Sequence, residues 1–215
     1  MSIGEPGTRS VKIASDERTG WSSDRPRGGD DRPPRPVDVT TRCRLLTVAD
    51  RMRYSPGSLV LVVSASAADR DRFVERVFEE QGAVLGLDKV RALVAGRVPD
   101  DQLEERAAAL LEAAVHKRLE GGQAVVVPAV GIDAGERERY VRVAHSFRRP
   151  RHIILLETAR GNVTDDDALV LNELRRAIDT GEIGNEGFQT ALRLGGATID
   201  ELKRIVFRPA PRDDD

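Results

Sequence analysis

The sequence predicts an α/β fold of three layers, in which a mainly parallel sheet is flanked by helices. Two observations predict it. Short apolar runs rich in β-branched residues alternate along the chain with longer segments of helical periodicity, and the runs show no polar alternation, which is typical of strands buried on both faces. In addition, 215 residues with 40% apolar content are enough for one well-buried core.

The first half of the chain supplies two of the strands. "SLVLVV" at 58–63 is predicted to be a strand, and 69–82 a helix that ends at Gly82. Residues 100–122 place apolar side chains on one helical face and close with Gly121 and Gly122. "QAVVVPAV" at 123–130 follows as a second buried strand.

The second half continues the alternation with a helix at 135–150, a strand at 151–158 and a helix at 165–181 that ends at Gly181. A short helix leading into a final strand is predicted over 198–209. Buried strands joined through helices require right-handed crossovers, which make the sheet parallel.

Composition divides the chain into three parts. Residues 1–40 are rich in Gly, Pro, Ser, Asp and Arg and are predicted to be a disordered arm, either a solvated tether or a partner-binding arm anchored by Trp21. Residues 41–208 form the predicted α/β domain, with the start of the globular part expected between 38 and 57, and 209–215 form an acidic tail.

Charge and cysteine content narrow the classes of protein. The 34 basic and 36 acidic residues nearly cancel, so no global field favours nucleic acid or a membrane. Cys43 is the single cysteine and suits a reducing compartment, so we expect a cytoplasmic protein without a membrane partner. His116, His145 and His152 lack metal-type spacing, so no metal site is expected.

The turn after the first strand carries a degenerate phosphate-loop pattern. A working G-x-x-x-x-G-K-[ST] loop needs glycines for its backbone conformation, a lysine for the β- and γ-phosphates and a hydroxyl for Mg²⁺. The corresponding positions here hold Ser64, Asp69, Arg70 and Asp71, with Ser66 inside the loop. These five residues are predicted to be a vestigial phosphate loop, because two carboxylates stand where phosphates would bind.

Residues 57–190 resemble the P-loop kinase domain of bacterial polynucleotide kinases and related small AAA-type ATPases. The resemblance is carried by "GSLVLVVSASAADRDRF", "LDKVRALVAG", "LLEAAVHKRLEGGQAVVVPAV", "ERYVRVAHSFRRPRHIILLE" and "NEGF". It implies a P-loop NTPase-like fold, with Asp88 and Arg91 matching an Asp and an Arg that serve the substrate hydroxyl and phosphate. Pro128 and Val130 occupy the second-strand motif, where the family has an acidic residue and a hydroxyl.

The resemblance also places the lid of the family near 158–176. Lid arginines clamp the donor phosphates in that family, and the remnants here are Arg160, Arg175 and Arg176. Arg91 and Arg160 are therefore the predicted substrate-binding arginines. The alternative for Asp88 and Arg91 is an i, i+3 surface ion pair at the start of a helix.

Joint loss of the glycines, the lysine, the metal hydroxyl and the second-strand Asp predicts a catalytically inactive, kinase-like protein that acts as a binding or scaffolding subunit, with a protein partner and no cofactor. The first alternative is an active ATP- and Mg²⁺-dependent phosphotransferase on polynucleotide 5′-hydroxyls. In that enzyme Asp88 is the base, Arg91 the substrate clamp and Arg70 the replacement for the lysine.

The second alternative is a nucleic-acid-binding module without chemistry. It depends on a basic patch of Arg148, Arg149 and Arg151, with Tyr140 available for stacking against bases. The competing explanation is that these arginines complement the dipole at a helix end.

Overall fold

The computed structural model describes residues 42–158 and 163–209. The predicted arm at 1–40, the predicted lid residue Arg160 and all but the first residue of the predicted tail lie outside these ranges. The remaining predictions can be compared with the structure element by element.

Five strands form a parallel sheet in the order β1-β6-β5-β3-β4. Their bounds are β1 Arg44–Leu45, β3 Leu59–Val63, β4 Val125–Pro128, β5 Arg151–Leu156 and β6 Thr190–Leu194. Every neighbouring pair runs parallel. All residues of β3, β4 and β5 are buried, which confirms the three strands predicted from continuous apolar runs.

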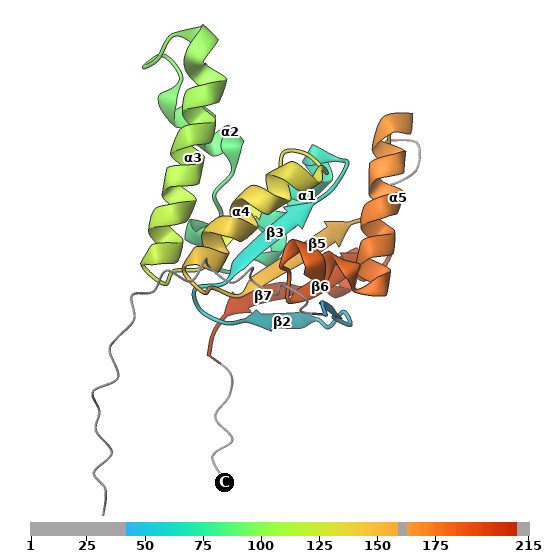
Figure 1. The fold of residues 1–215 in the computed structure, drawn as a ribbon. Coiled ribbons are helices and arrows are strands. Elements are labelled where there is room, and N and C mark those ends of the chain that lie inside the picture. The colour runs from blue at the N-terminus through green and yellow to red at the C-terminus, as the bar shows by residue number, and fades with distance from the viewer. Residues whose placement is uncertain (1–41, 159–162, 210–215) are drawn as a thin grey trace, which may run out of the picture. The chain divides into compact units, whose positions relative to one another are not determined.

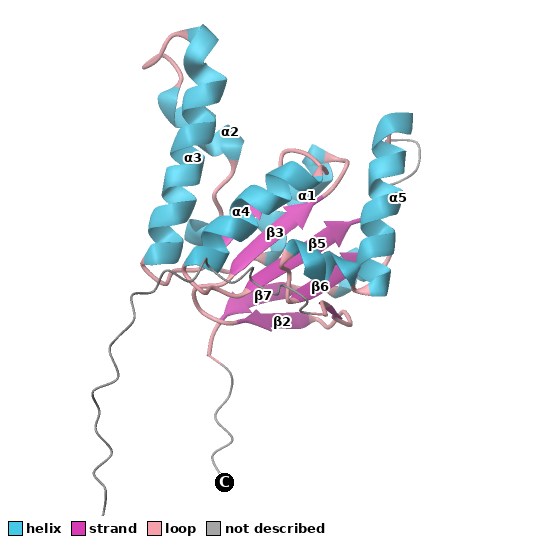
Figure 2. Ribbon diagram, in the orientation of Figure 1, coloured by secondary structure: helices cyan, strands magenta, loops and turns pink. Residues whose placement is uncertain are grey.

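Helices and a small second sheet cover the two faces, so the three-layer α/β prediction is confirmed (Figures 1 and 2). One face carries α3 Leu103–Glu120, α4 Ala134–Ser146 and α5 Asp165–Thr180. The other carries α1 Ala67–Val77, α6 Thr198–Glu201 and the parallel pair of β2 Arg51–Tyr54 with β7 Arg204–Phe207.

The alternation of β3 side chains explains how the sheet holds both layers. Leu59, Leu61 and Val63 pack with α3, α4 and α5 in one cluster, whereas Val60 and Val62 pack with α1 and β7 in the other. Burial of these side chains on both faces is the main source of stability for the sheet, at roughly 1.5–3 kcal/mol for each fully buried aliphatic side chain.

Several predicted helix bounds were wrong. The helix predicted at 69–82 is α1 at 67–77, because Ser66 caps its first turn and Phe78 leaves the helix to form a bridge with Ile205. The helix predicted at 100–122 begins with the 3₁₀ turn η2 Asp100–Gln102. The final short helix and strand are present as α6 and β7.

A helical pair extends beyond the carboxyl edge of the sheet (Figure 1). It consists of α2 Leu87–Val94, which follows the 3₁₀ turn η1 Gln81–Ala83, and of the N-terminal part of α3. Within the described ranges, no helix is long and apolar enough to cross a membrane.

Strand order determines where a ligand site is expected. The connection from β3 leads to β4 on one side, whereas the connection from β5 leads to β6 on the other. The carboxyl ends of β3 and β5 therefore flank the topological switch point, where open α/β sheets normally bind ligands.

Candidate functional site

The turn between β3 and α1 contains only Ser64, Ala65 and Ser66. A phosphate loop places its whole glycine-rich segment between strand and helix. Here the helix already begins at Ala67, because the Ser66 hydroxyl accepts a hydrogen bond from the amide of Asp69 at 3.3 Å. The additional helical turn uses backbone that a phosphate loop would wrap around its ligand.

The backbone of this turn also lacks the conformation of an anion-binding nest. Within the described residues, positive φ occurs at six glycines and at Arg148, none of them between 64 and 71. A nest needs successive N–H groups that converge through left-handed residues. The amides of this turn are therefore not arranged to surround a phosphate.

Two hydroxyl groups meet across the switch point. Ser64 Oγ lies 3.1 Å from Thr158 Oγ1, and Ser64 Oγ also accepts from the amide of Ser66 at 3.2 Å. Ser64 and Thr158 are both buried. The ends of β3 and β5 are thus hydrogen-bonded to each other where a crevice would otherwise open.

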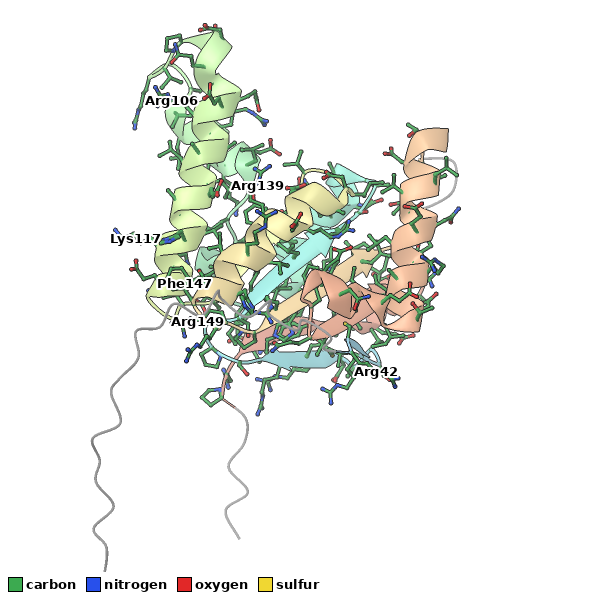
Figure 3. All side chains as sticks on the ribbon, viewed as in Figure 1. Arg42, Arg106, Lys117, Arg139, Phe147 and Arg149 are labelled. Carbon is green, nitrogen blue, oxygen red and sulfur yellow. The ribbon has the colours of Figure 1, made fainter. Side chains whose placement is uncertain are left out.

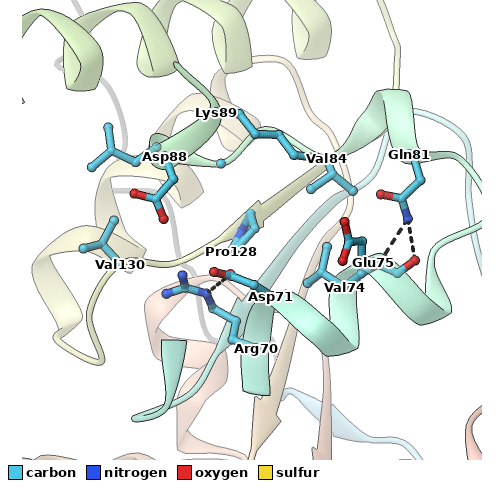
Figure 4. A pocket seen from close by; sticks show the side chains of 12 residues that line it. Arg70, Asp71, Val74, Glu75, Gln81, Val84, Asp88, Lys89, Pro128 and Val130 are labelled. Carbon is cyan, nitrogen blue, oxygen red and sulfur yellow. Dashed lines mark hydrogen bonds and ion pairs between the residues drawn. The ribbon is translucent and has the colours of Figure 1, made fainter. Parts of the chain in front are cut away.

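Arg70, at the position of the loop lysine, is buried with 5% of its surface exposed. Its Nη1 donates to the carbonyl oxygen of Ala129, just after β4, and its Nε donates to Asp71 Oδ1 at 2.8 Å. The guanidinium therefore lies against the end of β4 instead of above the turn (Figure 4).

Asp88 and Arg91 form an ion pair on α2, and Arg91 is held from a second side. Its Nε and Nη2 donate to the two carboxylate oxygens of Glu104 on α3, at 2.6 and 2.7 Å. These hydrogen bonds hold the pKa of Glu104 below its ordinary value. No sequence pattern indicated a role for Glu104, which lies 13 positions from Arg91.

A cleft of about 200 Å³ lies between α1, α2 and the end of β4 (Figure 4). It brings together several predicted site residues that are distant in sequence. Its lining consists of Arg70, Asp71, Val74, Glu75, Gln81, Val84, Gly86, Leu87, Asp88, Lys89, Pro128 and Val130. Apolar side chains and charged groups of both signs thus share one cleft.

A second recess of about 490 Å³ adjoins this cleft, and Leu87 and Val130 line both. Val130 is 57% exposed, which is unusual for a valine at the end of a buried strand. The Glu136 carboxylate accepts from the amides of Val130 and Gly131 at 2.9 and 2.8 Å. The backbone amides that follow β4 are therefore already bonded to a carboxylate of the protein itself.

The two described lid candidates bond to neighbouring carboxylates. Arg175 donates to both oxygens of Glu157 at the end of β5, and Arg193 donates to Glu157 at 2.6 Å. Arg176 is exposed and pairs with Glu182 at 3.3 Å. Burial favours a raised pKa for Glu157, but the hydrogen bonds from Arg175 and Arg193 outweigh it and lower the pKa.

The predicted basic patch lies at the opposite, amino edge of the sheet. Arg148, Arg149 and Arg151 line one recess there, at the end of α4 and the start of β5. Tyr140 does not belong to it: only 4% of this residue is exposed, because it packs in the core between α4 and the sheet, so the stacking role proposed for it was wrong.

No group of three or more His, Cys, Asp or Glu residues within 42–158 and 163–209 is arranged to hold a metal ion. Cys43 is buried in the core cluster, where burial raises the pKa of its thiol to about 11.

Residues 59–165 match the family described as "AAA domain". The matched residues run from β3 to the start of α5, so this part of the chain is similar to an AAA domain. No curated protein is similar enough to the chain to count as a match.

Among solved structures, this domain is similar to a "putative kinase" from Chloroflexus aurantiacus J-10-fl. The two chains are 15% identical, the similarity covers 68% of this chain and 88% of the other, and the TM-score is 0.40.

Proposed function

We propose that this P-loop kinase-like domain binds a partner without transferring phosphate. The observation that supports this most directly is the position of Arg70. A lysine at this place in a working loop reaches the β- and γ-phosphates. Arg70 is instead buried and donates to the Ala129 carbonyl and to Asp71, so turning it toward a triphosphate would leave that carbonyl and carboxylate without their donor.

Charge adds to this conclusion. Asp69 lies in the first turn of α1 and Asp71 directly after it, where a bound phosphate would need the positive end of the helix. Like charges about 4 Å apart repel by roughly 4 kcal/mol near a protein surface. A metal-bound triphosphate at this turn would meet these carboxylates and would find the Asp69 amide already bonded to Ser66.

The expected effect on catalysis is large. Removal of one preorganised donor costs about 3 kcal/mol of transition-state stabilisation. If the lysine, the loop amides and the metal ligand are all missing, the rate falls on the order of a millionfold. We therefore infer an inactive kinase-like domain that works without ATP or Mg²⁺.

The cleft and its adjoining recess are the best-supported binding surface. The apolar side chains of Leu87 and Val130 lie where the two meet, and Val130 is largely exposed. An exposed aliphatic side chain between two recesses, surrounded by charged residues, is typical of a protein-binding surface. We propose a protein partner here and, because Cys43 is a free thiol, a cytoplasmic location.

Nucleotide binding tests the proposal. The full chain is heated with Mg-ATP, with Mg-GTP and without nucleotide, and we expect the same Tm in all three. In parallel, transfer of labelled phosphate to a 5′-hydroxyl oligonucleotide is measured, with Asp88→Asn as the control. A nucleotide-dependent rise in Tm that Arg70→Gln removes, or transfer that Asp88→Asn abolishes, would establish the phosphotransferase alternative instead.

A further inference from the structure

We infer that the amino edge of the sheet holds a second binding site, which takes a phosphate group. The recess there has a volume of about 450 Å³ and is lined by His145, Ser146, Arg148, Arg149, Arg151 and Gln189. Three of these six residues are arginines, and none is a carboxylate. The recess lies at the edge of the sheet opposite the cleft. The inference about the recess does not depend on the function proposed for the cleft.

Two of the arginines are fixed in place by the protein. Arg149 donates to the carbonyl oxygens of Leu119 and Glu120 at the end of α3, at 2.8 and 3.2 Å. Arg151 is 8% exposed and donates to the carbonyl oxygen of Gly187 at 2.6 Å. Both positive charges are therefore held without a carboxylate counterion among the lining residues, and little side-chain entropy remains to be lost on binding.

Arg148 is the unusual member. It is the one non-glycine residue with positive φ, 55°, within the described ranges. It follows α4 in a Schellman arrangement, in which the Arg149 amide donates to the Ala144 carbonyl at 2.8 Å and the Arg148 amide to the His145 carbonyl at 2.9 Å. Glycine is the residue that normally occupies this position.

The side chain of Arg148 is exposed and makes no hydrogen bond or ion pair with any described residue. An arginine in left-handed backbone is less stable than glycine would be, by about 1–2 kcal/mol. Such a conformation is often kept for function. Here it holds a free guanidinium at the rim of a recess that already contains two fixed arginines.

The other polar groups of the recess also present donors. A guanidinium has no acceptor, so the 3.2 Å contact from Arg151 Nη1 makes His145 Nδ1 the acceptor and leaves its proton on Nε2. Gln189 Oε1 accepts from the Arg151 amide at 3.2 Å, which leaves its NH₂ group free to donate. Donors with net positive charge around one recess match a tetrahedral oxyanion, and the planar fork of arginine suits phosphate in particular.

The phosphate can belong to a small phosphorylated molecule or to a nucleic-acid strand. Lys117 and Phe147 lie on the same side as Arg149, near the C-terminal end of α3 (Figure 3). His116 packs edge-on against Phe147 with ring centroids 4.8 Å apart. A strand would therefore meet the further positive charge of Lys117 beside the recess.

Binding is tested with the full chain at low ionic strength in chloride buffer, using pyrophosphate and a single-stranded oligonucleotide as probes. We expect saturable binding of at least one probe. Arg148→Gly should raise the Tm of the free protein by about 2–4 °C, because glycine fits the backbone there, and should weaken binding about 10- to 100-fold. Arg106→Gln removes the same charge from an exposed position at the far end of α3 and should leave binding unchanged (Figure 3).

Tight binding of pyrophosphate alone identifies a small phosphorylated ligand, and oligonucleotide binding that pyrophosphate displaces identifies a strand. Equal losses in Arg148→Gly and Arg106→Gln, or no binding of either probe, would refute the site. ATP also carries phosphates, so the nucleotide experiments on the carboxyl-edge cleft are repeated in the Arg148→Gly variant. A nucleotide effect that persists there and requires Arg70 belongs to the cleft.

Discussion

Ser64 Oγ lies 3.1 Å from Thr158 Oγ1, so the carboxyl ends of β3 and β5 are joined by a buried side-chain hydrogen bond. This is the point at which an open α/β sheet normally leaves a crevice for its ligand. This hydrogen bond therefore contributes to the stability of the domain, and its removal should lower the free energy of unfolding.

Thr158→Val should lower the free energy of unfolding by about 1 kcal/mol, because one buried hydroxyl partner is lost while the shape is kept. Ser64→Ala should cost a similar amount. In a double-mutant cycle measured by urea unfolding, the two residues should show a coupling of about 1 kcal/mol. Strictly additive effects would mean that the hydroxyls do not interact.

Restoring three of the four consensus residues should not restore nucleotide binding. In the triple variant Asp69→Gly, Arg70→Lys and Asp71→Thr, the lysine, the glycine and the metal hydroxyl return, but α1 still begins at Ala67 under the Ser66 cap. We also expect a loss of about 2 kcal/mol in stability, since Arg70 no longer donates to Ala129 and Asp71. Calorimetric titration with Mg-ATP measures the first effect and urea unfolding the second. Micromolar ATP binding by this variant would contradict the prediction, because it would show that the backbone of the turn can still surround a phosphate.

His152 should make the protein less stable in mild acid. Its ring is buried, stacks on Tyr54 with centroids 4.3 Å apart and bonds to Thr190 through Nδ1 at 2.8 Å. Burial, and then the neighbouring charge of Arg151, lower its pKa to about 4.

The unfolded chain binds a proton on His152 near pH 6.5, but the folded protein does not do so until about pH 4. Stability is therefore complete above pH 6.5 and falls as the pH drops between these values, by about 2 kcal/mol from pH 7.5 to 5. Urea unfolding at a series of pH values measures this. His152→Gln should be less stable at pH 7.5 but have a flatter profile, and an unchanged slope would exclude His152 as the cause.

Glu157 should stabilise the folded protein down to a lower pH than His152 does. Its pKa is lowered in the folded state by Arg175 and Arg193 despite burial. Its contribution is therefore present above the ordinary carboxyl pKa and is lost as the pH falls through the folded value. Glu157→Gln should cost about 1–2 kcal/mol at pH 7, and the difference from the unmodified protein should shrink below pH 4. Arg176→Gln, which removes an exposed ion pair, should change stability by less than about 0.5 kcal/mol.

The sequence predicted the elements that are buried throughout, because their apolar pattern is independent of their neighbours. Strand β6 was not predicted: Arg193 interrupts its apolar run, and in the fold this exposed side chain donates to Glu157 and Asp179. Strand β1 has two exposed residues and no pattern to detect. The formation of such strands depends on partners far away in the chain.

The residue types of the candidate site could be predicted from the sequence, but their hydrogen-bond partners could not. The substitutions at Ser64, Asp69, Arg70 and Asp71 are plain in the sequence, and so is the short spacing of Asp88 and Arg91. The acceptor of Arg70, the Ala129 carbonyl, lies 59 positions away and carries no side-chain signal. A sequence pattern specifies which groups are present, whereas long-range packing decides where they point.

Strand pairing also has a consequence for how the chain acquires its structure during synthesis. Among the described strands, β1 pairs only with β6 and β2 only with β7, so these two early strands leave the ribosome well before their partners are synthesised. A nascent chain that stops before residue 190 contains β3, β4 and β5 but has unpaired edges on β5 and β2. We expect such chains to be held by chaperones, and the complete domain to form only after translation of β7.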